Sequence, residues 1–338
     1  MTNLPRAVSA ESCPTTPRSR LGVGIPGLTA RDAERVSAAL EAELAASTLE
    51  VYASAWRRWD AWCGVRGITA LPASPETVAA YLAERAEAGL SYGSIDLACS
   101  AIAHRHRQHG VADPTTDLTV RRVRRGLRRI VGTAPRRQAH PLNVREVAQI
   151  LSAMDPRAVT AVRDRAIILL GYAAALRPGE LSALRLADVT ARADGLLVRI
   201  RRSKTDQESR GQLVGVAPGR HPRTDPVVAL ASWAALRPRG QGPLFTRIHP
   251  AGVASTDPIG VRTVSRMVQT RAKAAGLGDL PITGHSLRAG HATTAAANGA
   301  GIARIAMQTR HRDLDTLMEH YIRPTDALAT TTSQDLGL

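Results

Sequence analysis

The sequence predicts a mainly α-helical protein of two domains, the second of which contains a small antiparallel β-sheet. A chain of 338 residues is long enough to form two hydrophobic cores of ordinary size. Between residues 28 and 129, apolar residues recur at intervals of three and four, the period of an amphipathic helix. In the second half, residues 196–201 place an apolar side chain at every second position, as a half-buried strand does.

The N-terminal half begins with a proline- and glycine-rich segment, residues 1–27, which we expect to be a flexible tail. The helices that follow, in residues 28–131, are expected to begin at Ser47 or Thr48, at Ser74, at Ser94 and at Val120. The clearest start is Ser74, because a cap residue is followed there by a proline and an early carboxylate. The aromatic residues of these helices are expected to pack in a core rather than to stack on bases: Tyr52, Trp56, Trp59 and Tyr81.

Residues 132–141 contain Pro135 and Pro141, which prevent one continuous helix, and we expect a linker to the second domain, residues 142–338. Asn143 is a candidate cap for the first helix of that domain, and an apolar helix is predicted over residues 166–176. Two apolar runs, 196–200 and 213–216, predict a β-hairpin with Lys204 near its turn.

The charge of the chain indicates an acidic partner. The formal net charge is +16, and residues 101–140 contain ten arginines against two acidic residues. A GC-rich genome would account for a high arginine content overall, but not for this clustering. Aromatic residues make up only 3% of the chain, which favours duplex DNA over single strands. The DNA-binding candidates are Arg121, Arg122, Arg124, Arg125, Arg128, Arg129, Arg136 and Arg137, with His104, His106 and His109 expected to be solvated or close to DNA.

Three widely spaced cysteines suggest a reducing compartment, and no apolar run is long enough to span a membrane. We therefore expect a cytoplasmic, nucleoid-associated protein. The histidines lack the spacing of metal ligands and have no carboxylate cluster beside them, so neither a metal nor another cofactor is expected.

A set of polar residues in the second half suits chemistry on a phosphodiester: Arg177, Lys204, His285, Arg288, His311 and Tyr321. Guanidinium groups bind phosphate oxygens in pairs of hydrogen bonds. Pro178 places Arg177 beside a helix N-terminus, which also attracts anions. Arg288 follows His285 by three residues, so the two are expected to share a helix face.

Two of these residues are distinguished by their rarity or position. Lys204 is one of only two lysines among 45 basic residues, and lysine, unlike arginine, can give up a proton. Tyr321 is one of five tyrosines and lies near the end of the chain. Because a phenol has a pKa of about 10, its deprotonation is expected to accompany attack rather than precede it.

Four stretches carry a resemblance to the tyrosine recombinase (phage integrase) family: residues 163–181, 203–206, 285–288 and 309–314 with the tyrosine that follows. The resemblance implies a SAM-like, helical core-binding domain and a mostly helical catalytic domain. It also implies that Tyr321 is a nucleophile that forms a 3′-phosphotyrosyl link to DNA, without metal or ATP. Lys204 would protonate the departing 5′ oxygen, and Glu180 would orient Arg177.

The resemblance further implies a homotetramer on two DNA sites, with a possible accessory directionality factor. One feature departs from the family pattern, because His311 and Tyr321 are ten residues apart, one more than is usual. The catalytic histidine is expected to be His311 rather than His320, which adjoins the tyrosine. Two other functions remain open: strand relaxation of the type IB topoisomerase kind, and DNA binding by a catalytically inactive relative.

Overall fold

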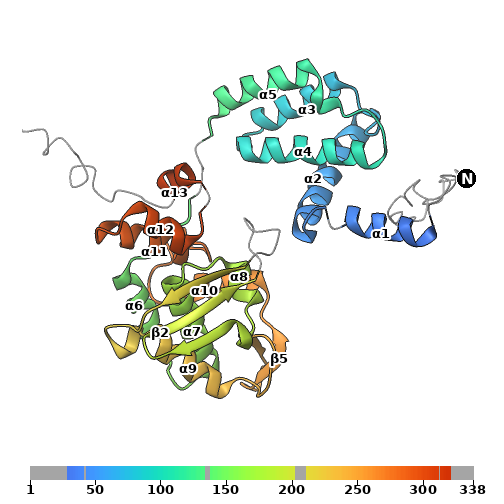
Figure 1. Cartoon of the computed structure of the whole chain (residues 1–338). Coiled ribbons are helices and arrows are strands. Elements are labelled where there is room, and N and C mark those ends of the chain that lie inside the picture. The colour runs from blue at the N-terminus through green and yellow to red at the C-terminus, as the bar shows by residue number, and fades with distance from the viewer. Residues whose placement is uncertain (1–28, 42, 134–137, 202–210, 312, 321–338) are drawn as a thin grey trace, which may run out of the picture. The chain divides into compact units, whose positions relative to one another are not determined.

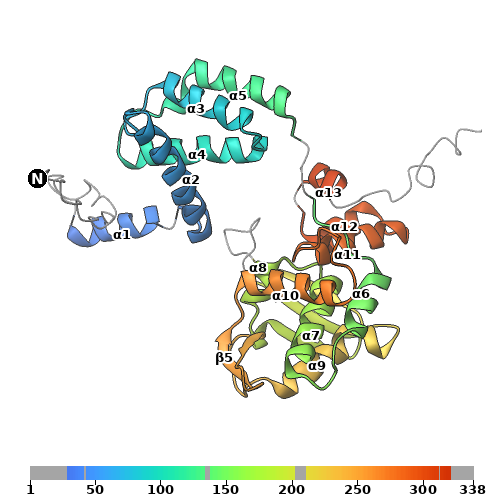
Figure 2. The same ribbon diagram turned by 180° about the vertical axis from the view of Figure 1, so that it is seen from behind.

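A computed structural model of the chain describes residues 29–41, 43–133, 138–201, 211–311 and 313–320. These residues form two compact units, Met1–Arg136 and Arg137–Leu338, and each is considered by itself (Figures 1 and 2). The division lies inside the segment that was expected to be a linker. The tail, residues 1–27, lies outside the described residues, as do Arg136 and Arg137.

The first unit is helical. Its elements are α1 (Ala30–Glu41), α2 (Ala46–Val65), α3 (Pro75–Glu87), α4 (Tyr92–Gln108), a short 3₁₀ helix (Pro114–Thr116) and α5 (Leu118–Val131). Helix α2 packs on α4, and α3 packs on α5 (Figure 1). The core centres on Trp59 and Tyr81, both almost fully buried, whose rings meet edge to face with centroids 5.1 Å apart.

Three of the helix starts differ from those predicted, since α5 begins at Leu118, with Asp117 as its cap, rather than at Val120. Ser74 caps α3 as expected, since its side chain accepts the amide N–H of Thr77. Helix α4 is capped by Ser91 rather than Ser94, because the hydroxyl of Ser91 accepts the Ser94 amide. Helix α2 begins before Ser47, since the amide of Thr48 already donates to the Ala45 carbonyl.

The side chains around α2 and α4 correct two further expectations. Trp56 packs against the core as expected, but both Trp56 and Tyr52 are only half-buried and line a cavity of about 300 Å³. His106 was expected to be solvated or close to DNA but is fully buried. Its Nδ1 donates to the Ile102 carbonyl and its Nε2 accepts the Ala73 amide, so it joins α4 to the loop before α3.

The second unit packs helices around a small sheet. Its helices are α6 (Val144–Ser152), α7 (Val159–Ala173), α8 (Pro178–Ala183), α9 (Pro226–Leu236), α10 (Val261–Ala274), α11 (Ser286–Ala297), α12 (Ile302–Thr309) and α13 (Leu314–His320). Short 3₁₀ helices cover Leu186–Asp188 and Pro222–Thr224. Strands β1 (Val189–Arg192), β2 (Gly195–Ile200) and β3 (Gln212–Val216) form an antiparallel sheet in that order, and β4 (Thr246–Ile248) pairs with β5 (Ala254–Pro258).

The predicted fold class, mainly α with a small antiparallel sheet, is confirmed. Strands β2 and β3 pair in antiparallel register, with Val198 opposite Val214, as the hairpin prediction required. Asn143 caps α6 in a reciprocal arrangement with Glu146. No helix of the described part is long and apolar enough to cross a membrane.

Helix α7 differs from its prediction at both ends, because it begins at Val159 and stops at Ala173 rather than continuing to residue 176. The chain leaves the helix through Ala175, whose φ of 49° is left-handed and incompatible with a continuing α-helix. After this turn and Leu176, the chain enters α8, with Arg177 as the cap residue and Pro178 as the first residue of the helix.

Candidate active site

Arg177 lies at the N-terminus of α8, held there by a carboxylate of the same helix. Pro178 occupies the first helical position, where its missing N–H has no consequence. The buried carboxylate of Glu180 accepts the Arg177 amide N–H at 2.8 Å and its Nη1 at 2.9 Å. Glu180 therefore holds both the backbone and the guanidinium of Arg177.

Arg288 lies in the first turn of α11 and is completely buried. Its Nη1 donates to the carbonyl of Ala175 over 2.8 Å, which ties α11 to the turn after α7. His285 does not share its environment, since it is the N-terminal cap residue of α11 and is exposed, with its amide donating to Thr283 Oγ1. The two residues therefore differ in burial, and their shared helix face stays a prediction.

His311 lies between α12 and α13 and contacts Arg288 directly. The Nη2 of Arg288 is 3.2 Å from His311 Nε2, and Thr309 Oγ1 is 2.8 Å from His311 Nδ1. A guanidinium can only donate, so Nε2 must accept and the proton must be on Nδ1, which donates to Thr309. The Thr309 hydroxyl in turn donates to the Ile305 carbonyl at 2.7 Å.

The environment of His311 keeps its imidazole neutral. Desolvation lowers its pKa to about 3, assisted by the positive charges of Arg288, Arg177 and Arg310 against a smaller opposing effect of Asp313. A neutral ring agrees with the tautomer that the hydrogen bonds require. It can accept a proton at Nε2 if the guanidinium turns to another acceptor.

Arg310 immediately precedes His311 and is almost fully buried. Its Nη2 donates to Glu180 Oε2 at 2.7 Å and to the Ala175 carbonyl at 2.9 Å. Its Nη1 donates to the carbonyls of Ala174 and Gln308, at 3.1 and 2.8 Å. The sequence alone does not indicate a role for Arg310, because only the fold brings residues 174, 180 and 310 together.

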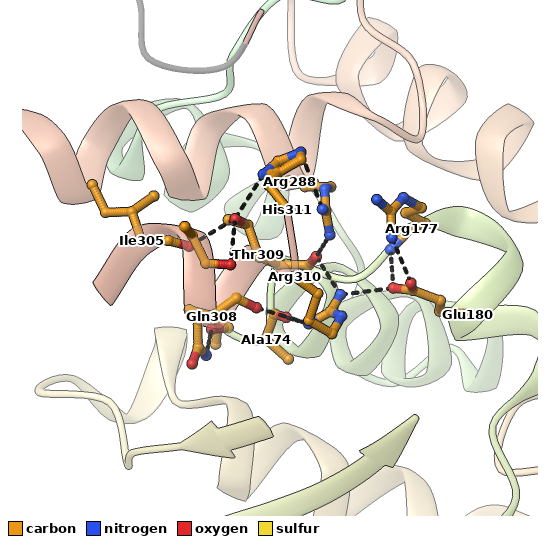
Figure 3. A network of polar contacts seen from close by, with 12 residues as sticks. Ala174, Arg177, Glu180, Arg288, Ile305, Gln308, Thr309, Arg310 and His311 are labelled. Atoms are coloured by element: carbon orange, nitrogen blue, oxygen red, sulfur yellow. Dashed lines mark hydrogen bonds and ion pairs between the residues drawn. The ribbon is translucent and has the colours of Figure 1, made fainter. Parts of the chain in front are cut away.

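These contacts gather Arg177, Arg288 and His311 into one network, with Arg310 and Glu180 beneath them (Figure 3). The network contains three guanidiniums and one carboxylate, which is paired with Arg177 and Arg310, so it carries a net charge of +2 when His311 is neutral. Guanidiniums in a partly dehydrated site bind phosphate oxygens strongly and with a defined geometry. The arrangement is therefore suited to a phosphate group.

Other predicted site residues lie elsewhere. Lys204 and Tyr321 lie outside the described residues, although Tyr321 directly follows the last residue of α13. In the part of the chain that is described, no group of three or more histidine, cysteine, aspartate or glutamate side chains could hold a metal ion.

The basic helix α5, in the first unit, carries most of the predicted DNA-binding arginines. Leu127 and Val120 are buried against the unit, whereas five arginines of this helix are exposed: Arg121, Arg122, Arg125, Arg128 and Arg129. Arg124 is the exception, because it is partly buried and forms an ion pair with Asp96. It is therefore less available to a partner than its neighbours.

The sequence model of the phage integrase family matches residues 141–327, more than half of the chain. The chain belongs to the phage integrase family. An integrase/recombinase XerD homologue of Selenomonas ruminantium is 30% identical over 286 residues, covering 84% of this chain and 83% of the relative. The recombinase Cre of Escherichia phage P1 is 27% identical, covering 83% of this chain and 84% of Cre.

Solved structures of family members share the fold. A lambda integrase dimer bound to a COC′ core site superposes with a TM-score of 0.57 at 18% identity, covering 87% of this chain and 95% of that chain. A lambda integrase tetramer bound to a Holliday junction gives 0.57 at 17% identity, covering 86% and 76%. The predicted enzyme class, a tyrosine-type recombinase of DNA recombination and integration, agrees with this family.

Proposed function

We propose that this protein is a site-specific DNA recombinase that cuts and rejoins duplex DNA through a 3′-phosphotyrosyl intermediate, without metal or ATP. The observation that carries the proposal is the convergence of Arg177, Arg288 and His311 from three separate segments on one site of net positive charge. Membership of the phage integrase family supports it independently.

In the proposed reaction, Arg177 and Arg288 bind the non-bridging oxygens of the scissile phosphate, where negative charge increases during attack. The Tyr321 phenol oxygen forms a bond to phosphorus and loses its proton. His311 is a candidate acceptor for that proton, because its Nε2 has a lone pair, and His285 is a candidate donor to the phosphate. The bond to the 5′ oxygen breaks, and Lys204 protonates that oxygen.

The second half of the reaction reverses the first. The 5′ hydroxyl of another strand attacks the phosphotyrosyl phosphorus and displaces the phenol of Tyr321. One phosphodiester is exchanged for another through the protein link, so no external energy source is required. We infer that the exposed arginines of α5 bind the DNA backbone, and that four protomers act on two DNA sites. The lambda integrase tetramer on a Holliday junction supports this assembly.

The direct test is the covalent intermediate. The DNA flanking the gene is searched for inverted repeats around a short spacer, the protein is incubated with a nicked duplex of that sequence, and the protein–DNA adduct is resolved on a denaturing gel. The Tyr321→Phe variant should bind this duplex normally but form no adduct. The control is Tyr92→Phe, which removes a phenol hydroxyl from α4 in the first unit and should give a normal yield.

An adduct of normal yield from Tyr321→Phe would contradict the assignment of the nucleophile. Relaxation of supercoiled plasmid without strand exchange by the wild-type protein would instead indicate activity of the type IB topoisomerase kind. Normal binding with no adduct from the wild-type protein would indicate a catalytically inactive relative.

A further inference from the structure

The residue before His311 is an arginine in a conformation that disfavours any side chain. Arg310 ends α12 with φ 58° and ψ 44°, in the left-handed region. A residue with a Cβ is less stable there than glycine by roughly 1 kcal/mol. Its side chain is also a charged group that is only 2% exposed, and burial of a charge requires a partner. The contacts of the side chain must therefore compensate for both costs.

Two of the contacts of Arg310 are to groups that also bind Arg177 or Arg288. The carbonyl of Ala175 accepts from both Arg310 Nη2 and Arg288 Nη1. The carboxylate of Glu180 accepts from both Arg310 Nη2 and Arg177 Nη1. Arg310 is thus the one residue of this network that contacts the acceptors of both other arginines (Figure 3).

The position of Arg310 has an electrostatic consequence. Glu180 is needed to fix Arg177, but without a second cation its charge would cancel that of the guanidinium it orients. The side chains of Arg310 and Glu180 are 2% and 3% exposed, whereas that of Arg177 is 14% exposed. The buried ion pair is therefore between Glu180 and Arg310, and Arg177 is the more accessible of the two cations.

From this arrangement we propose that Arg310 is a positioning residue, the counter-ion that neutralises Glu180 so that the full charges of Arg177 and Arg288 are available to the scissile phosphate. The inference rests on the proposed function, because the anion in question is the phosphate that this reaction would cleave. Arg310 does not contact the phosphate in this mechanism but acts through Glu180 and the Ala175 carbonyl.

The test compares two substitutions of similar size. Arg310→Gln keeps hydrogen-bond donors but removes the charge, and Arg310→Lys keeps the charge. Adduct formation on the nicked duplex is measured in single turnover with the full-length protein. Arg310→Gln should be about 10²-fold slower than wild type, as for a displaced or weakened phosphate ligand. Arg310→Lys should be clearly faster than Arg310→Gln. Duplex binding, measured by mobility shift, should change little.

A second substitution separates the role of the charge from simple structural support. If Arg310 acts as a counter-ion, removal of the negative charge of Glu180 should compensate for its loss. Arg310→Gln/Glu180→Gln should therefore cleave about tenfold faster than Arg310→Gln alone. A double variant that is no faster, or an Arg310→Gln variant that cleaves at the wild-type rate, would overturn the inference. Should Arg310→Gln not fold, the same comparison is made with Arg310→Gly, which relieves the left-handed strain.

Inorganic phosphate provides a measurement that does not depend on catalysis. At constant ionic strength, phosphate should raise the thermal midpoint of the wild-type protein relative to chloride. The rise should be smaller in Arg310→Gln and should recover in the double variant. If the wild-type protein forms no adduct but the phosphate-induced rises in thermal midpoint follow this pattern, the proposed function is wrong and the anion site is supported. If adducts form and phosphate gives equal shifts in all three proteins, the role of Arg310 fails alone.

Discussion

The close contact between α11 and the segment before α6 makes Gly290→Ala a sensitive test of how Arg288 is supported. Gly290 lies two residues beyond Arg288 on the same helix. A Cβ added there would lie 1.9 Å from the Leu142 carbonyl oxygen and within 2.9 Å of the Leu142 nitrogen. All of these are backbone atoms, so no rotamer change can relieve the contact. Leu142 itself is fully buried, and its amide donates to the Ser286 carbonyl at 3.2 Å.

The expected loss of stability follows from these contacts. The distance must grow from 1.9 Å to at least 3.0 Å, so the helix or the segment must move by about 1.1 Å. Overpacking of this kind costs about 1–3 kcal/mol, and loss of the Leu142 hydrogen bond costs about 1 kcal/mol more. Replacement of glycine by alanine within a helix stabilises the helix by at most about 1 kcal/mol, which offsets part of this loss. The free energy of unfolding should therefore fall by about 1–4 kcal/mol.

The assay is thermal and urea unfolding, with Gly179→Ala as the matched control. Gly179 lies in α8 of the same unit, is exposed, and has open space where a Cβ would be added. For a unit of this size, Gly290→Ala should lower the thermal midpoint by about 2–16 °C. Gly179→Ala should be neutral or should raise it slightly. Equal effects of the two substitutions would refute the packing argument, and adduct formation by Gly290→Ala should fall because Arg288 moves with α11.

Three further outcomes are expected. Lys204→Ala should cleave ordinary DNA slowly, and its cleavage rate should largely recover on a 5′-bridging phosphorothiolate, because sulfur leaves without protonation. Equal defects on both substrates would mean that Lys204 does not protonate the leaving group. Four exposed arginines of α5 are neutralised together: Arg121, Arg125, Arg128 and Arg129. Binding to specific and random duplexes should weaken alike, and the slope of log affinity against log salt should become shallower by roughly 3–4 units. Arg124→Gln should change this slope less, because Arg124 is paired with Asp96. The unfolded chain takes up a proton at His311 as the pH falls through about 6.5, but the folded protein, with its pKa near 3, does not. From pH 7 to pH 4, the free energy of unfolding should therefore fall more steeply in the wild-type protein than in His311→Gln. The difference should be less than about 1.4 kcal/mol per pH unit, because the ring is partly exposed. Equal pH dependence of the two proteins in urea unfolding would contradict this.

The sequence was sufficient where the physical cause is local. Pro178 predicts the start of α8 and thereby the place of Arg177, and Asn143 and Ser74 predict the helix starts they cap. The same reasoning failed at α4, where Ser91 and Ser94 are both acceptable cap residues and the local sequence does not distinguish them. Local signals name the type of an element more reliably than its first residue.

The sequence was insufficient where residues far apart in the chain meet. Arg288 and His311 are in contact across 23 positions, and Arg310 reaches Glu180 across 130. Nothing in the composition of residues 309–311 indicates that one arginine is buried and the next residue is a neutral histidine. His106 shows the same limit in the first unit, since three histidines of similar spacing gave no indication that this one is a buried bridge to Ala73.

The backbone around the candidate active site gives a physical reason for its rigidity. Among the described residues, two that are not glycine have a positive φ, Ala175 and Arg310. They meet at one point, because the Ala175 carbonyl accepts the Arg310 guanidinium as well as that of Arg288. Strained conformations persist only where the surrounding contacts compensate for them, and they gather where a fixed geometry has a use. Here the two strained turns hold Arg288 and His311 against each other before any phosphate arrives, so the cost of ordering these side chains is met in folding rather than in binding.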